Sequence, residues 1–250
     1  MMPSDSHPIT DEKATPADSV STWTDTFVAH SRNRIIHRVR FSYYEKAFFS
    51  QITDKNARIL DVGCGSGEFI SLLQQRGYKN LYGVEIDPAL VDMSSKVLPD
   101  IIKSSAIDLP YDNNSFDCIY MFNVMHHLHD MAEYEQALAE MARCLRDGGR
   151  IILVEPCRLA LYRLLKAVCF VGSPFSRFFR NFYLILHEEN VYLSYFLRHL
   201  DLLRRRILAS AEFEVLEDSK LLHQWITVIA VNKDGSCSNV EQAGSIEKQT

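Results

Sequence analysis

The sequence predicts an α/β fold, a doubly wound and mostly parallel seven-stranded sheet with a helical insertion after the fifth strand. Short apolar runs alternate with helical patterns along most of the chain, which is typical of a parallel sheet covered by helices. A glycine-rich turn at 63–67 joins the first apolar run directly to a helical pattern. Residues 157–210, which separate the fifth and sixth strands, form a longer stretch than one connecting helix needs.

The apolar runs and breaking residues place the elements along the chain. Strands are expected at 57–62, 80–85, 101–103, 116–122, 150–155, 213–216 and 225–231. Helices are expected at 67–76, from Pro88 onward and at 131–145, where Gly148 and Gly149 should end the last of them. Arginines alternate with apolar residues over 30–50, which predicts an amphipathic helix that packs over the ligand site.

Composition indicates one globular domain between two polar tails. The chain has 250 residues, of which 47% are hydrophobic, and the stretches 1–22 and 233–250 are expected to be disordered. Residues 1–22 lack the basic start and apolar core of a signal peptide. The net charge of −5 gives no general attraction to nucleic acid. Six cysteines without a C-x-x-C pair predict a reduced, cytoplasmic protein that has neither disulfides nor structural zinc.

The turn at 63–67 predicts a small-molecule site. Its three glycines follow Asp61, and glycine lets the backbone approach a ligand closely. A dinucleotide fingerprint would need its third glycine at position 68, where Glu68 would repel a pyrophosphate. The spacing suits a ligand that carries an ammonium and a carboxylate instead.

The segment Leu60-Asp61-Val62-Gly63-Cys64-Gly65-Ser66-Gly67 resembles the first motif of the class I S-adenosylmethionine-dependent methyltransferases. The resemblance covers about residues 57–156, with a looser match at 206–232. It implies a Rossmann-like methyltransferase domain over 23–232, with S-adenosyl-L-methionine as the cofactor. The sequence from the glycine turn to the paired histidines resembles the small-molecule branch of the family, which includes quinone, sterol and polyketide methyltransferases.

Acids at the next two strand ends are predicted to hold the adenosine. Glu85 would accept hydrogen bonds from both ribose hydroxyls, whereas its alternatives are a solvated turn acid or a helix cap made by Asp87. The resemblance places adenine at Asp108, with the backbone of Ile107 at the ring edge. The alternative for Asp108 is a turn aspartate before Pro110.

Asp61 is predicted to hold the methionine ammonium, directly or through water, and it could cap the turn at the same time. The other residues of the predicted cofactor-binding set are Gly63, Cys64, Gly65, Gly67, Ile86, Leu109 and Asn123.

Histidines follow the fourth strand, where such transferases place the reactive methyl. His126 and His127 are the predicted catalytic residues, which line the acceptor pocket or act as a general base. Packing against the loop is the alternative for either ring, and His129 should open the next helix. No metal site is predicted, because no Cys/His pair lies at ligand spacing from these rings.

The acceptor is expected to be a small, apolar or lipid-like molecule. DNA is not expected as the acceptor. Nucleic-acid adenine methyltransferases carry an Asn/Asp-Pro-Pro-aromatic motif at the position where this chain has Asn123-Val124-Met125-His126. The segment 157–210 carries nine Lys/Arg against three acids. It could form a lid over the acceptor, a surface for peripheral membrane contact, or a plain helical cap. RNA contact through Arg204-Arg205-Arg206 is the weaker hypothesis.

The sequence therefore predicts a methyltransferase that moves a methyl group to a small acceptor by in-line displacement. The alternatives are a protein that binds S-adenosylmethionine without catalysis, an RNA methyltransferase, and a nicotinamide-dependent oxidoreductase. The oligomeric state and the methylated atom are left open.

Overall fold

The computed structural model describes residues 34–233, apart from 158, 177–178, 181–182, 184–186, 188–189 and 222–223. The predicted tails therefore lie outside the described residues, except for Lys233. The strands are β1 (Arg58–Val62), β2 (Asn80–Glu85), β3 (Ile101–Lys103), β4 (Phe116–Phe122), β5 (Leu145–Pro156), β6 (Phe213–Leu221) and β7 (Gln224–Val231). The helices are α2 (Arg34–Phe49), α3 (Glu68–Gln75), α4 (Pro88–Ser94), η1 (Met125–His127), α5 (Met131–Cys144), α6 (Leu159–Gly172) and α8 (Asn190–Ala209).

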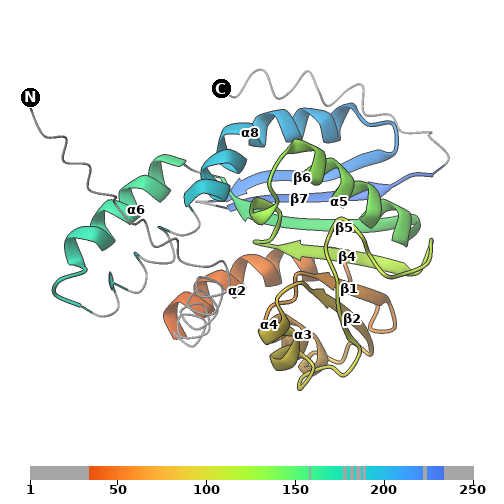
Figure 1. Cartoon of the computed structure of the whole chain (residues 1–250). Coiled ribbons are helices and arrows are strands. Elements are labelled where there is room, and N and C mark those ends of the chain that lie inside the picture. Colours follow the sequence, from red (N-terminus) through yellow and green to blue (C-terminus); the bar gives the residue numbers. More distant parts are fainter. Residues whose placement is uncertain are drawn as a thin grey trace, which may run out of the picture.

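The strands form one seven-stranded sheet in the order β3-β2-β1-β4-β5-β7-β6 (Figure 1). The first five strands pair in parallel, whereas β7 pairs antiparallel with both β5 and β6. This arrangement confirms the predicted doubly wound, mostly parallel sheet. The order reverses between β1 and β4, and open α/β sheets bind ligands at such a switch point, outside the carboxyl ends of the strands.

Helices cover both faces of the sheet, and side chains alternate between the two cores with the strand period of two. On β4, Tyr120 and Phe122 belong to the core shared with α2 and α3, while Ile119 and Met121 belong to the core shared with α5 and α8. On the neighbouring strand, Asp61 pairs with Tyr120 in register. A carboxylate therefore enters the aromatic core beneath α2.

Two helices in the described part of the insertion after β5, α6 and α8, have different roles. The inner face of α8 buries Phe196, Leu200, Leu203 and Ile207 against the sheet. Full burial of such side chains contributes about 1.5–3 kcal/mol each, so α8 is the covering helix of the domain. In contrast, α6 extends away from the sheet and is the added element (Figure 1). It ends at Gly172.

Two element boundaries differ from the expectation. α5 ends at Cys144, and β5 begins at Leu145 rather than at residue 150. Gly148 has a φ of +69°, and a Cβ on Gly149 would lie 2.8 Å from the carbonyl oxygen of Arg146. The two glycines therefore shape an irregular stretch of strand, where the register with β4 shifts, and do not end the helix. β6 also runs on to Leu221, because its polar second half pairs with β7.

Candidate active site

The glycine turn lies between β1 and α3 and holds a backbone that other residues would strain. Gly63, Gly65 and Gly67 have φ values of +75°, +55° and +78°. A Cβ on Gly63 would lie 2.4 Å from a methyl group of Val124, in the loop after β4. Glycine is therefore required here both for the turn and for the close approach of two strand ends.

Glu85, at the end of β2, fastens the turn. Its carboxylate accepts hydrogen bonds from the backbone N–H groups of Gly65 at 2.8 Å, Ile86 at 2.8 Å and Asp87 at 3.0 Å. Glu85 is buried, so it is not a solvated turn acid. The Asp87 side chain separately caps α4. A carboxylate offers about four acceptor sites, so Glu85 keeps room for one further donor. Contact with both ribose hydroxyls would require it to release a backbone group.

Asp61 lies buried at the end of β1, beside the turn. Its carboxylate accepts a hydrogen bond of 2.8 Å from the Tyr120 hydroxyl. Burial raises the pKa of Asp61 well above its usual 3.8, the Tyr120 hydrogen bond opposes this rise, and the charge of Glu85 adds to it. An ionised Asp61 is therefore costly until a cation comes close.

A cavity opens to solvent at the glycine turn, with about 430 Å³ of empty space when the open solvent at its mouth is included. Four of its lining residues were predicted from the sequence, namely Asp61, Gly63, Cys64 and Gly65, whereas the predicted Gly67 does not line it. The remaining lining comes from the turn, β4, α2 and α3: Ser66, Tyr120, Phe122, Phe41, Tyr44, Glu68 and Phe69. None of these described lining residues is a Lys or an Arg. The cavity thus combines a buried carboxylate with aromatic rings, which suits a cationic ligand.

The α2 helix closes one side of this cavity. The ring of Tyr44 stacks on Phe122 with the centroids 4.5 Å apart. Its hydroxyl accepts a hydrogen bond of 2.6 Å from the side-chain amide of Asn123. The Oδ1 atom of Asn123 is buried and has no hydrogen-bond partner among the residues that the structure describes. Asn123 also has a φ of +56°, so a strained residue presents an unsatisfied acceptor beside the cavity.

The predicted adenine residues lie outside the cavity, in the loop after β3. Asp108 is exposed, and Ile107 is half-buried with its carbonyl oxygen accepting a hydrogen bond of 2.9 Å from Gln136. Leu109 is buried in the core, and its N–H donates to Glu140. Ile86, after β2, is 64% exposed. The roles of these four residues toward adenine stay predictions. Of the four, Ile86, Ile107 and Asp108 are accessible to a ligand, whereas Leu109 is not.

The two predicted catalytic histidines lie in η1 with different surroundings. His126 is buried, and its Nδ1 atom lies 2.7 Å from Oε2 of Glu155. The other oxygen of Glu155 accepts the backbone N–H groups of Val124 at 2.8 Å and Met125 at 2.7 Å. Glu155 thus holds the first part of the β4–α5 loop, residues 124–126, and orients the His126 ring.

The His127 ring lies close to that of His126, with the centroids 4.2 Å apart and the ring planes tilted by 34°. Burial, and secondly the charge of His126, lower the pKa of His127 well below its usual 6.5. Its imidazole is therefore neutral at physiological pH, the form that a general base requires. Neither ring lines the cavity at the turn, so a catalytic role for either stays a prediction. His129 precedes α5, whose cap is Asp130.

Sequence reasoning missed Glu155 and the aromatic lining. An acid at the end of the apolar run Ile151-Ile152-Leu153-Val154 is a signal for Glu155, because a strand buried on both faces also buries the residue at its end. The strand period of two along β4 could have placed Tyr120 and Phe122 on the same face of the sheet as the Asp61 side chain. The sequence predicts that the 30–50 helix packs over the site, but it does not say which side chains of α2 reach this face, because that contact is made across the fold.

The chemistry of these groups fits S-adenosylmethionine. The buried Asp61 carboxylate and the free acceptor of Asn123 match an ammonium group, while the aromatic rings match a sulfonium. The remaining acceptor site of Glu85 matches a ribose hydroxyl.

Comparisons with known proteins point to the same cofactor. Residues 60–153 match the family described as "Methyltransferase domain". A ubiquinone/menaquinone biosynthesis C-methyltransferase of Campylobacter jejuni is 26% identical over 109 residues, which cover 40% of this chain and 45% of that protein. An uncharacterized methyltransferase of Mycobacterium bovis is 31% identical over 119 residues, which cover 47% of each chain. The matched region thus spans about half the length of these curated relatives.

Solved structures share the fold over more of the chain. A Pyrococcus horikoshii protein, PH0226, has a TM-score of 0.58 at 20% identity and covers 84% of this chain and 95% of that one. A Thermotoga maritima S-adenosylmethionine-dependent methyltransferase has a TM-score of 0.55 at 20% identity and covers 85% and 99%. At this identity the likeness concerns the fold alone. Residues 60–153, which include the glycine turn, are thus similar to a methyltransferase domain, and these solved structures share the fold of the chain.

Proposed function

We propose that the protein transfers the methyl group of S-adenosylmethionine to a small, apolar or lipid-like acceptor by in-line displacement. The observation that carries this proposal is the cavity at the glycine turn, where a buried carboxylate, Asp61, lies among aromatic rings with no Lys or Arg in the described lining. Such a cavity favours a ligand that brings its own positive charge.

The chain's residues would hold the cofactor by its polar ends. Asp61 would accept the ammonium, which lowers the cost of ionising this buried acid. Glu85 would accept one ribose hydroxyl at its remaining site, and Asp108 would face the adenine amino group from the open side of the sheet. Tyr44 and Phe122 would then lie along the path between the two ends, where a sulfonium gains from aromatic faces.

Methyl transfer requires mainly orientation from the protein. When bound, S-adenosylmethionine supplies an electrophilic methyl carbon on a sulfonium. Holding the nucleophile in line with that carbon can provide about 7–11 kcal/mol. A base is needed only if the acceptor must lose a proton, and the neutral ring of His127 is the group whose lowered pKa suits that step.

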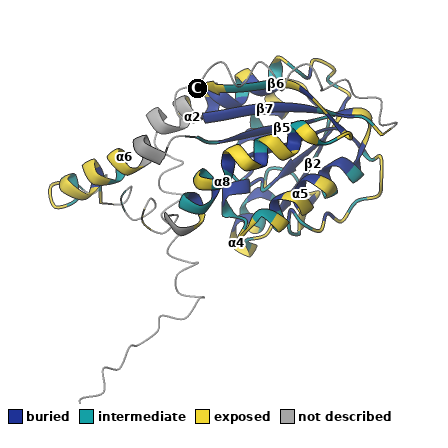
Figure 2. Cartoon of the chain, turned by 90° about the horizontal axis from the view of Figure 1, so that it is seen from above, coloured by how far each residue is buried: buried dark blue, intermediate teal, exposed yellow. Residues whose placement is uncertain are grey.

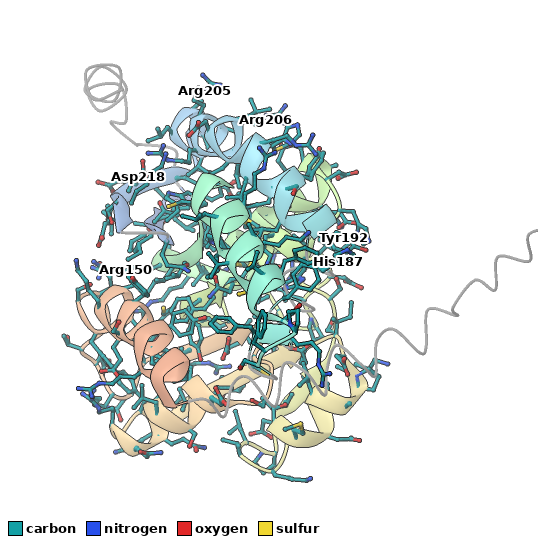
Figure 3. All side chains as sticks on the ribbon, turned by 90° about the vertical axis from the view of Figure 1, so that its left-hand side faces the viewer. Arg150, His187, Tyr192, Arg205, Arg206 and Asp218 are labelled. Carbon is teal, nitrogen blue, oxygen red and sulfur yellow. The ribbon has the colours of Figure 1, made fainter. Side chains whose placement is uncertain are left out.

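Beside the cationic cofactor, the cavity supports an apolar acceptor. Its lining is aromatic, and the Campylobacter jejuni relative is named for quinone biosynthesis. The arginine cluster of α8 gives little support to RNA. Figure 3 shows Arg205 and Arg206 at one end of α8, with Asp218 nearby. Arg204 forms an ion pair with Asp218, and Arg206 forms one with Glu135, so acids neutralise two of the three arginines.

Calorimetric titration with S-adenosylmethionine and, separately, with NAD tests the cofactor. We expect binding of the first alone, and binding that is lost in Gly65→Arg. Gly77→Arg is the matched control, because Gly77 also has a positive φ, +86°, but open space around it. Binding of NAD without S-adenosylmethionine would refute the proposal, as would full affinity in a folded Gly65→Arg protein.

Transfer of a labelled methyl group tests the catalytic step. The protein is incubated with labelled S-adenosylmethionine and the organic-soluble fraction of a cell extract, and the labelled product is identified by mass spectrometry. Label in a small organic-soluble molecule supports the proposal. Cofactor binding without label in any fraction indicates a binding protein without catalysis, and label in RNA indicates a different acceptor.

A further inference from the structure

The α6 helix and the turn after it expose a set of large apolar side chains. Val171 is 69% exposed and Phe175 is 88% exposed. Figure 2 shows exposed residues along α6, which extends beyond the body of the domain. We call this set the α6 patch: Leu164, Leu165, Val168, Phe170, Val171 and Phe175. Single exposed apolar residues are ordinary, but a contiguous set indicates a binding surface.

The opposite side of α6 is packed, so the exposed side is not required to hold the helix in place. Cys169 is fully buried and lies in a small cluster with Leu193 of α8, and Phe179 packs against it. A Cβ on Gly172 would lie 2.7 Å from the Phe179 ring, so the end of α6 is fitted closely to its neighbour. The helix thus has one structural face and one outward apolar face.

The charge around the patch has a single sign. The stretch 157–187 contains five Lys/Arg and no Asp or Glu, although the whole chain carries a net charge of −5. Arg163 and Arg180 are exposed, and Lys166 is half-buried. The same stretch holds seven Phe or Tyr. Apolar and aromatic side chains with basic neighbours favour the boundary between lipid headgroups and acyl chains, where cations meet phosphate.

The length of α6 limits how deep it can reach. α6 has 14 residues, whereas a membrane span needs about 20. No helix among the described parts of the chain is long and apolar enough to cross a bilayer. A helix of this kind lies in the interface.

We propose that the α6 patch binds the surface of an anionic bilayer, with Phe175 and Val171 inserted below the headgroups and Arg163 and Lys166 at the phosphates. This inference does not depend on the identity of the methyl acceptor, because it rests on the outward face of α6 and not on the cavity.

Vesicle flotation with the full chain tests the proposal. We expect binding to vesicles of phosphatidylglycerol and phosphatidylcholine in equal parts, weak binding to phosphatidylcholine alone, and weakening by salt. Arg163→Gln and Lys166→Gln should each lower the partition constant about fivefold. Val171→Ser with Phe175→Ser should lower it at least about tenfold.

Matched variants elsewhere on the surface separate the patch from general effects. Lys96→Gln and Lys103→Gln remove exposed charges, and Leu216→Ser removes an apolar side chain that is 44% exposed on β6. These should leave vesicle binding unchanged. Circular dichroism confirms that each variant is folded, and titration with S-adenosylmethionine in the absence of lipid reports the cofactor site separately.

A tryptophan reporter measures insertion directly. In a Trp23→Phe background, Phe175→Trp should show a blue-shifted emission with anionic vesicles and quenching by lipids brominated on the acyl chains. Bound protein without quenching would overturn the proposal, and so would vesicle binding that the patch variants do not change. Self-association that Phe175→Ser abolishes, without vesicle binding, would identify a protein interface and also overturn it.

Discussion

Glu155→Ala should lower the free energy of unfolding by about 3–5 kcal/mol, because it removes the acceptor for two buried donors and one partly buried donor. The carboxylate is fully buried and receives the N–H groups of Val124 and Met125 and the Nδ1 atom of His126, at 2.7–2.8 Å. Each buried donor left without a partner costs about 1–3 kcal/mol, and water that enters the space left by the side chain would recover part of the sum.

The same loop offers a control for this prediction. Glu133 also accepts hydrogen bonds from a histidine, His129, but the His129 side chain is 69% exposed. Glu133→Ala should therefore cost less than about 1 kcal/mol. Urea unfolding followed by far-UV circular dichroism gives both values. A Glu155→Ala protein that loses no more stability than Glu133→Ala would refute the view that Glu155 holds the loop.

The site supports three further predictions. Asp61→Asn should raise stability at neutral pH and weaken S-adenosylmethionine binding. Burial raises the pKa of Asp61, so the contribution of this acid to stability is complete below pH 3.8 and is lost as the pH rises through the pKa of the folded state. Unfolding midpoints measured from acid to neutral pH should therefore change less with pH in the variant than in the original protein. Gly63→Ala should cost about 2–4 kcal/mol through strain and its clash with Val124, against about 1 kcal/mol for Gly77→Ala, where no atom lies within 4 Å; equal losses in urea unfolding would contradict this. Because burial and His126 lower the pKa of His127, the rate of methyl transfer should not fall as the pH drops through 6.5, and a loss centred there would exclude His127 as the base.

The sequence was sufficient for the features that local patterns determine. The alternation of apolar runs predicted the sheet, because a parallel strand is buried on both faces and the helix between two strands has its own period. The glycines at 63–67 predicted the turn, because few other residues tolerate its backbone. Gly148 and Gly149 misled for the same reason: glycine marks a positive φ without saying whether a helix end or an irregular strand requires it.

The features that sequence could not predict depend on contacts between distant segments. Tyr44 reaches the cavity only because α2 packs across the end of β4, and Asn123 meets it there. Glu155 acts on a loop that precedes it by about thirty residues. The sequence also left the role of the apolar residues of α6 ambiguous. Apolar residues on a helix normally indicate packing in a core, and only the structure shows that no other element covers the outward face of α6 among the described residues.

The sheet order has a consequence for how the protein is made. β7 is the last described strand, yet it lies between β5 and β6 and covers the edge of β5 over Arg150–Pro156. During synthesis, the apolar β5 strand therefore leaves the ribosome well before its partner. Until β7 arrives, this edge offers unpaired backbone groups to any other extended chain, so the nascent protein depends on chaperone protection or on rapid completion more than a sheet built strand by strand would.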